Sequence, residues 1–193
     1  MNRKDIEKKA EKLIDDLGIN AIPISVDKIA VHAGCQVKPF NDDKDGVSGV
    51  FMVKDGVPMI GYNGNQSPVR QRFTIAHELG HFILHNSNDP REVFVDHNTF
   101  PLFRDENSST GASIIEQQAN AFAAALLMPE KFVTAEIKNL NLDLTDESPA
   151  LTELAKKFDV SLMAMSIRLV NLHLVHGNGS NKRKTTSFGN FDF

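Results

Sequence analysis

One segment limits the possible folds of this chain more than any other. FTIAHELGHFILH, at residues 73–85, is an apolar run that polar side chains interrupt. Ser67 and Pro68 precede it, and this pair is typical of a helix start, because serine caps free N–H groups and proline fits the first helical turn. We therefore predict a buried helix that runs to about His85. Polar side chains inside such a helix are costly unless something compensates them.

The polar residues of this helix have the spacing of a metal site. His77 and His81 are four residues apart, so both imidazoles project from one helix face and can converge on one ion. Glu78 lies beside that row, near enough to reach a water at the ion, which is the position of a general base. The pattern H-E-x-x-H also arises by chance in about one such chain in a hundred. Coincidence would leave costly polar groups in an apolar helix, so we favour a zinc site.

A catalytic zinc ion needs a third protein ligand and an open fourth position. The candidates for the third ligand are Glu116, His85, Asp96 and His97. Glu116 lies on a second predicted helix, where Asn120 one turn later is suited to hydrogen-bond a ligand. His85 is a further turn along the first helix, and we expect it to pack or to support the site. Ser113 and Glu116 also form a capping box, which would instead occupy the carboxylate at the helix start.

The first half of the chain predicts helices followed by a small sheet. Apolar residues at helical spacing over residues 6–17 predict an amphipathic helix that stops at Gly18. A short helix capped by Ser25 leads into the extended segment CQVKPF. GVSGVFMV and VPMIGYN predict a strand hairpin, because Asp55–Gly56 supplies the positive φ of a tight turn. Residues 86–112 are polar and broken by prolines, so we expect a long loop there.

The last part of the chain offers a competing interpretation. EKFVTAEIKNL predicts a helix after Pro129, and LTELAKKFDVSLMAMSIRL has the helix, turn and helix of a DNA-binding repressor, with Ser161 as a cap. The second of these helices is nearly all apolar and has Arg168 as its main candidate for reading bases. A reading helix needs polar side chains. We therefore expect its apolar residues, including Leu162 and Met163, to lie in the core.

Composition limits the classes of function. The formal net charge of −4 over 193 residues gives no global field that would draw the chain to nucleic acid or an anionic membrane. The one cysteine, Cys35, permits neither an internal disulfide nor a cysteine-based zinc site, and it indicates the cytoplasm. The longest apolar run, residues 121–128, is too short to span a membrane, and the basic N-terminus lacks the apolar core of a signal peptide. We predict one domain, residues 1–176, followed by a disordered tail, residues 177–193.

Two blocks of this sequence resemble the ImmA/IrrE family of zinc metallopeptidases: RQRFTIAHELGHFILH at residues 70–85 and EQQANAFAAALLMP at residues 116–129. A weaker block at residues 154–172 and the strand MIGYN extend the resemblance over most of the chain before the tail. The resemblance implies an α+β fold, in which a small mixed β-sheet packs on a zincin-like helical core. That core would carry the HExxH helix and a second ligand-bearing helix.

The resemblance also implies a function. His77, His81 and Glu116 would be the zinc ligands and Glu78 the catalytic glutamate of a gluzincin-like endopeptidase. The implied substrate is an intracellular protein, commonly a helix-turn-helix repressor of a phage, a mobile element or a stress operon. The expected partner is thus a protein, without direct binding of nucleic acid or membrane. The alternative that stays open is a metal-binding regulator that does not cleave, and that acts on the repressor or on DNA.

Two further expectations concern the substrate. The strand at residues 47–53 could accept an extended peptide by edge addition, although an ordinary sheet edge is the simpler interpretation. Tyr62, His97 and Arg168 are candidates for stabilising the oxyanion. For Tyr62 we favour a packing role in the sheet.

Overall fold

The computed structural model of this chain describes residues 1–42, 46–85, 93–97, 111–140 and 149–175. The helices are α1 (Arg3–Asp16), α2 (Val26–His32), α3 (Pro68–His85), α4 (Gly111–Leu127), α5 (Glu130–Leu140), α6 (Pro149–Phe158) and α7 (Leu162–Asn171). The strands are β1 (Gln36–Phe40), β2 (Val47–Lys54), β3 (Val57–Asn63) and β4 (Val93–His97). The predicted α+β fold with a small mixed sheet is confirmed.

The described strands form one sheet in the order β1-β3-β2-β4. β1 runs parallel to β3, whereas β2 is antiparallel to both β3 and β4. β2 and β3 form the predicted hairpin, and Asp55 and Gly56 at its turn have φ angles of 53° and 78°. Because β2 has a neighbour on each side, the predicted edge addition at residues 47–53 is wrong. Among the described strands, the edges of the sheet are β1 and β4.

Strand β4 lies in a segment that the sequence indicated to be loop throughout. Residues 93–97 pair with β2, and helix α4 already begins at Gly111, so the expectation of one long loop over residues 86–112 is wrong in these two places. A short strand is stabilised by its cross-strand neighbours more than by its own sequence, and here the neighbour is distant along the chain. Residues 86–92 and 98–110 lie outside the described part of the structure.

Capping residues explain where several helices begin and end. Ser67 Oγ accepts a hydrogen bond from a backbone N–H of the first turn of α3 at 3.4 Å, and Ser161 Oγ does the same for α7 at 3.1 Å. Helix α1 is followed by Gly18, whose φ of 61° suits the residue after a helix. Ser25 stands at the start of α2 as predicted, but its side chain makes no capping hydrogen bond. That part of the expectation is wrong.

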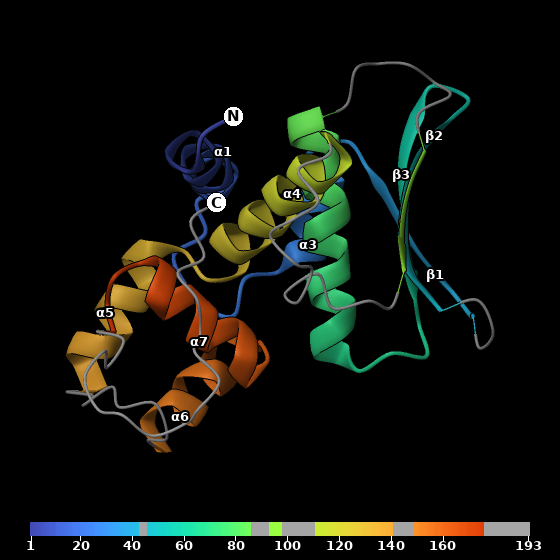
Figure 1. The fold of residues 1–193 in the computed structure, drawn as a ribbon. Helices are drawn as coiled ribbons and strands as arrows, with labels where there is room; N and C mark the ends of the chain where they lie inside the picture. The colour runs from blue at the N-terminus through green and yellow to red at the C-terminus, as the bar shows by residue number, and fades with distance from the viewer. Residues whose placement is uncertain (43–45, 86–92, 98–110, 141–148, 176–193) are drawn as a thin grey trace.

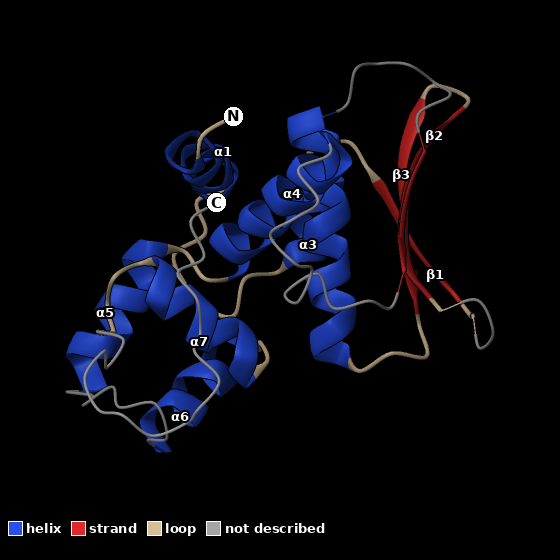
Figure 2. Cartoon of the chain, in the orientation of Figure 1, coloured by secondary structure: helices blue, strands red, loops and turns tan. Residues whose placement is uncertain are grey.

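Helix α3 is the centre of the molecule. Figures 1 and 2 show the sheet along one side of it and helix α4 packed on another, while α5, α6 and α7 gather away from the sheet. Phe51 of β2 is fully buried, and its ring centroid lies 5.5 Å from that of Phe82 on α3. Gly80 of α3 faces α4, where an added Cβ would lie 3.1 Å from the carbonyl oxygen of Ala119. The small residue thus lets the two helices approach closely.

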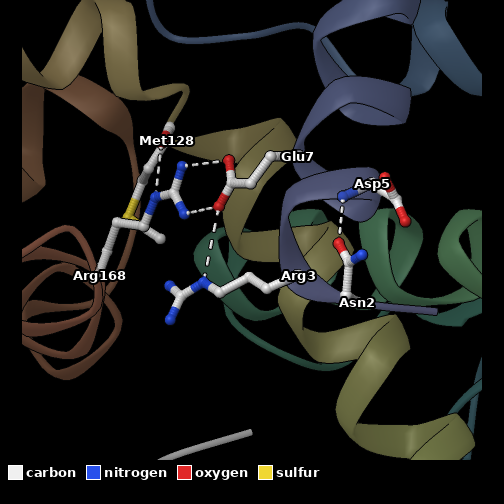
Figure 3. Close-up of polar contacts among 6 residues, drawn as sticks. All are labelled: Asn2, Arg3, Asp5, Glu7, Met128 and Arg168. Atoms are coloured by element: carbon white, nitrogen blue, oxygen red, sulfur yellow. Dashed lines mark hydrogen bonds and ion pairs between the residues drawn. The ribbon is translucent and has the colours of Figure 1, made fainter.

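A buried arginine fastens α7 to the rest of the molecule (Figure 3). The side chain of Arg168 is nearly inaccessible, and its Nε donates to the carbonyl oxygen of Met128, just after α4, at 2.9 Å. Its two terminal nitrogens donate to the two carboxylate oxygens of Glu7 on α1. The guanidinium is therefore committed to these partners, and the structure supports neither of its predicted roles, in base reading or in stabilising an oxyanion.

The apolar side chains of α7 are divided between core and surface. Met165 and Leu169 are buried, as predicted. Leu162 and Met163 are 49% and 38% exposed, so the expectation that they lie in the core is wrong. Both belong to the first turn of α7, and they lie on a different side of the helix from Met165, which is fully buried.

The structure bears only partly on the expectation that the chain does not span a membrane, and it does not test the expected C-terminal tail. Within the described residues, no helix combines the length and the apolar character that crossing a membrane would require. The predicted tail, residues 177–193, lies outside the described residues. Its disorder and the domain boundary at residue 176 stay predictions.

Candidate metal centre

The HExxH helix directs its polar side chains toward two different neighbours. His77 and His81 contact residues of α4, whereas Glu78 lies against the glycine of strand β2 at position 49. One residue along a helix turns the side chain by about 100°, and this rotation separates the glutamate from the histidine row. All three side chains are buried, with exposed fractions of 1%, 0% and 1%. The helix therefore holds them in a site that solvent hardly reaches.

Glu116 on α4 completes a group of three side chains that could hold a metal ion together. Among the described residues, this is the one such group. Its carboxylate oxygens lie 3.2 Å from His77 Nε2 and 3.3 Å from His81 Nε2, and the two Nε2 atoms are 3.1 Å apart. Ligands placed tetrahedrally at 2.0–2.1 Å from a zinc ion are about 3.3 to 3.4 Å from one another. The two imidazole nitrogens are thus at the spacing of two corners of a zinc tetrahedron, and each faces an oxygen of the Glu116 carboxylate at the same spacing.

The protonation states of the group suit a cation. Asn120 Oδ1 lies 2.9 Å from His77 Nδ1, so the ring donates outward and its Nε2 keeps a lone pair toward the cluster. Burial lowers the pKa of His81. Burial alone would raise the pKa of Glu116, but contacts with both imidazole rings outweigh it and hold that pKa well below its usual range. Neutral imidazoles and an ionised carboxylate are the forms in which these groups bind metal, and this donor set fits zinc.

The two histidines are oriented by different neighbours. His77 has the hydrogen bond to Asn120 and stacks on Phe73, at 6.1 Å between ring centroids. His81 stacks on Phe94 of strand β4, with 4.4 Å between centroids and 17° between the ring planes. Its Nδ1 is buried and has no hydrogen-bond partner among the described residues. The orientation of the second imidazole therefore depends on the sheet as well as on its own helix.

The structure favours Glu116 over His85 as the third ligand. His85 Nε2 lies 2.9 Å from Gln118 Oε1, which agrees with its expected supporting role. Asp96 and His97 belong to β4, but their side chains lie outside what the structure describes. Helix α4 begins at Gly111, two residues before Ser113, so Ser113 is not the N-cap that the capping box requires. The carboxylate of Glu116 faces the histidines instead.

Three residues around the site escaped the sequence analysis. Phe94 carries no recognisable motif, and its strand was not predicted. Thr74 and Gly49 lie against Glu78: a Cβ built on Gly49 would be 2.3 Å from Thr74 Cγ2 and 2.7 Å from Glu78 Oε1. A glycine within a strand signals a close approach of another group, and this signal was present in GVSGV. Tyr62 is partly buried against the core, in agreement with its packing role.

The sequence is similar to two proteins named radiation response metalloprotease IrrE. The one from Deinococcus radiodurans is 35% identical over 113 residues, which make up 58% of this chain and 30% of that protein. The one from Deinococcus deserti is 34% identical over 125 residues, which make up 61% of this chain and 40% of that protein. The chain thus spans less than half the length of either relative.

Similarity extends to a solved structure and to a family model. A Mycobacterium tuberculosis transcriptional regulator superposes with a TM-score of 0.56 and 19% identity, covering 86% of this chain and 46% of that chain, which shows a shared fold. The model of Peptidase_M78, the IrrE N-terminal-like domain, matches residues 14–170. That span includes Glu116 and the whole HExxH helix. On this evidence, and in agreement with the resemblance seen in the sequence, the chain belongs to the Peptidase_M78 family of IrrE N-terminal-like domains.

Proposed function

We propose that this protein is a zinc-dependent endopeptidase. The observation that carries the proposal is the cluster of His77, His81 and Glu116, in which the ring nitrogens and carboxylate oxygens approach one another to 3.1 to 3.3 Å. Membership of a peptidase family and similarity to proteins named as metalloproteases support the same reading. Glu78 on the adjacent helix face is the residue that would make such a site hydrolytic.

In the proposed reaction, each residue has a distinct task. The zinc ion would supply Lewis-acid chemistry, lowering the pKa of a water and polarising the peptide carbonyl. Glu78 accepts a proton from the attacking water and later gives it to the amine of the leaving fragment, while the new C–O bond replaces the broken C–N bond. Asn120 fixes the tautomer of His77 through Nδ1. The burial of Glu78 keeps competing water away from the proton that it carries.

We further propose that the substrate binds as an extended strand at β4. Among the described strands, β4 has a partner on one side only, so its other edge can take a peptide by main-chain hydrogen bonds. Phe94 of this strand contacts the ring of His81, and this places β4 beside the metal group. A peptide paired with β4 would thus pass close to His77, His81 and Glu116. This role replaces the one expected for β2.

The protein that we propose as substrate is a helix-turn-helix transcriptional repressor in the cytoplasm. The solved structure that shares the fold is named a transcriptional regulator, and the two relatives are named for a radiation response, which supports a place in gene control. We expect no direct contact with DNA, because the one arginine of the apolar helix α7 is buried in an ion pair. We expect no membrane partner either.

Co-expression with a candidate helix-turn-helix repressor from the same genome tests the proposal. Wild-type protein should generate two repressor fragments, detected by intact-mass spectrometry, and the new termini give the cleavage site. Glu78→Gln keeps the size of the side chain and removes the base, so it should bind zinc and the repressor but leave the repressor whole. If both proteins relieve repression equally and no fragments form, a non-proteolytic antagonist is the better interpretation.

A further inference from the structure

We propose that Gly49 is a positioning residue for Glu78. In this inference, which rests on the proposed hydrolytic function, the absence of a side chain on strand β2 creates the space in which the Glu78 carboxylate is held beside the metal group. A side chain at this position would displace the carboxylate without touching a metal ligand. Loss of catalysis with retention of zinc is therefore its signature.

The space around Gly49 is filled from α3. A Cβ built on this glycine would lie 2.3 Å from Thr74 Cγ2, 2.7 Å from Glu78 Oε1 and 3.2 Å from Glu78 Cγ. Contacts below 3.0 Å force some atom to move. Gly49 is not one of the residues with a positive φ, so its backbone would tolerate any side chain. The requirement for glycine is a requirement for room, and two of the three contacts belong to the catalytic candidate.

Strand β2 cannot easily retreat from this contact. The pairing with β4 shifts register between Val47 and Gly49, so Ser48 is the extra residue of a bulge. Ser48 is fully buried, and its Oγ accepts hydrogen bonds at 3.0 Å from Gln66 Nε2 and from Arg70 Nη2 of α3. This anchor ties the strand to the helix next to Gly49. A methyl group added at Gly49 would thus be carried by a strand that is held in place, and the Glu78 side chain would have to move.

The neighbouring strand offers a matched control. A Cβ on Gly61 of β3 would lie 2.8 Å from Val50 Cγ1 and 3.3 Å from Phe40 Cδ1. Val50 directly follows Gly49 in the strand, so its side chain points to the opposite face of the sheet. Gly61→Ala therefore crowds the same sheet by a similar amount, away from Glu78. Any effect that Gly49→Ala has and Gly61→Ala lacks is therefore caused by contacts on the face of the sheet that packs on α3.

A stability cycle tests the contact without any substrate. All variants carry Thr74→Ser, which removes the methyl group of the shortest contact and leaves Glu78 as the neighbour. In metal-free protein, Gly49→Ala should lower Tm by roughly 3 to 10 °C, as overpacking does. When Glu78→Ala is also present, most of that loss should disappear, because Oε1 and Cγ are gone. An equal loss in both backgrounds would overturn the proposal.

A variant that does not fold would still be informative. If Gly49→Ala with Thr74→Ser is unfolded, adding Glu78→Ala should restore a folded protein. Continued unfolding in that triple variant would overturn the proposal, because the obstruction would then lie elsewhere.

Cleavage of the candidate repressor provides the second readout. Gly49→Ala in the Thr74→Ser background should keep about one zinc ion per chain, hold KM near that of the Thr74→Ser protein and lower kcat at least about tenfold. Gly61→Ala should leave kcat unchanged. A normal kcat for the Gly49 variant would overturn the positioning role. If the wild-type protein cleaves nothing, the proposed function fails, and the stability cycle alone then decides whether Gly49 positions Glu78.

Discussion

Removing Glu7 should destabilise the protein strongly, because its carboxylate is the partner of a buried guanidinium. In Glu7→Ala the guanidinium of Arg168, which is 1% exposed, keeps, among the described residues, only its hydrogen bond to the Met128 carbonyl. A buried charge that loses its partner typically costs about 3–5 kcal/mol of the free energy of unfolding. For a domain of this size that corresponds to a fall in Tm of roughly 6 to 20 °C.

Replacing the other partner of the ion pair, Arg168, should cost less stability. Arg168→Met removes the buried charge and fills much of the same volume, and the Glu7 carboxylate that remains is 18% exposed and 3.9 Å from Arg3 Nε. We expect a loss of about 1–3 kcal/mol, set mainly by the unpaired carboxylate and the freed carbonyl. The double variant Glu7→Leu with Arg168→Met should cost less than Glu7→Ala alone, because apolar pairs often replace buried ion pairs without loss.

Urea unfolding of the metal-free variants measures these differences. Arg3→Ala is the matched control: it removes the other cation near Glu7 and should cost about 0.5 kcal/mol or less, as exposed pairs do. If Glu7→Ala costs under about 1 kcal/mol, or if the Glu7 and Arg168 effects simply add, the buried pair does not hold α7 to α1. Stable folding of Arg168→Met with loss of binding to operator DNA would return Arg168 to a base-reading role.

Three shorter predictions concern the site and the core. Asn120→Ala should weaken zinc binding about 10- to 100-fold in a chelator competition, because His77 loses the group that fixes its tautomer; unchanged affinity would remove Asn120 from the site. Gly80→Ala should also weaken zinc binding in that titration, because its Cβ would meet the α4 backbone at 3.1 Å and move the helix that carries Glu116; full affinity would show that α4 can yield elsewhere. Burial raises the pKa of the Cys35 thiol to about 12, so the reactive thiolate is almost absent at pH 8. Iodoacetamide should therefore label Cys35 only in denaturant, as mass spectrometry can show, and rapid labelling of folded protein would contradict the buried position.

The parts of the site that the sequence predicted are those fixed by local geometry. Helical spacing alone places His77 and His81 on one face, and it also places Asn120 one turn after Glu116. The turn chemistry of Asp55 and Gly56 predicted the hairpin in the same way, because positive φ angles are a local requirement. These predictions were correct because residues close together in the sequence determine such features.

The parts that failed depend on contacts between distant segments. Strand β4 forms through pairing with β2; the run Val-Phe-Val at residues 93–95 favours a strand, but it is too short to predict one without that partner. The position of β2 inside the sheet follows from that same pairing. Arg168 looked available because its partner, Glu7, is 161 residues away in the sequence. The role of Gly49 became visible only when the strand was placed against Glu78. These failures concern tertiary packing, whereas the missing capping hydrogen bond of Ser25 is a failure of a local rule.

A crystal structure of the protein grown with zinc, with anomalous data collected at the zinc edge, tests the central claim most directly. The account predicts one strong anomalous peak per chain, about 2.0 to 2.2 Å from His77 Nε2, His81 Nε2 and a carboxylate oxygen of Glu116, with Glu78 beside it and not bound to it. A peak held by other residues, Glu116 turned away from the ion, or no peak at this position would contradict it.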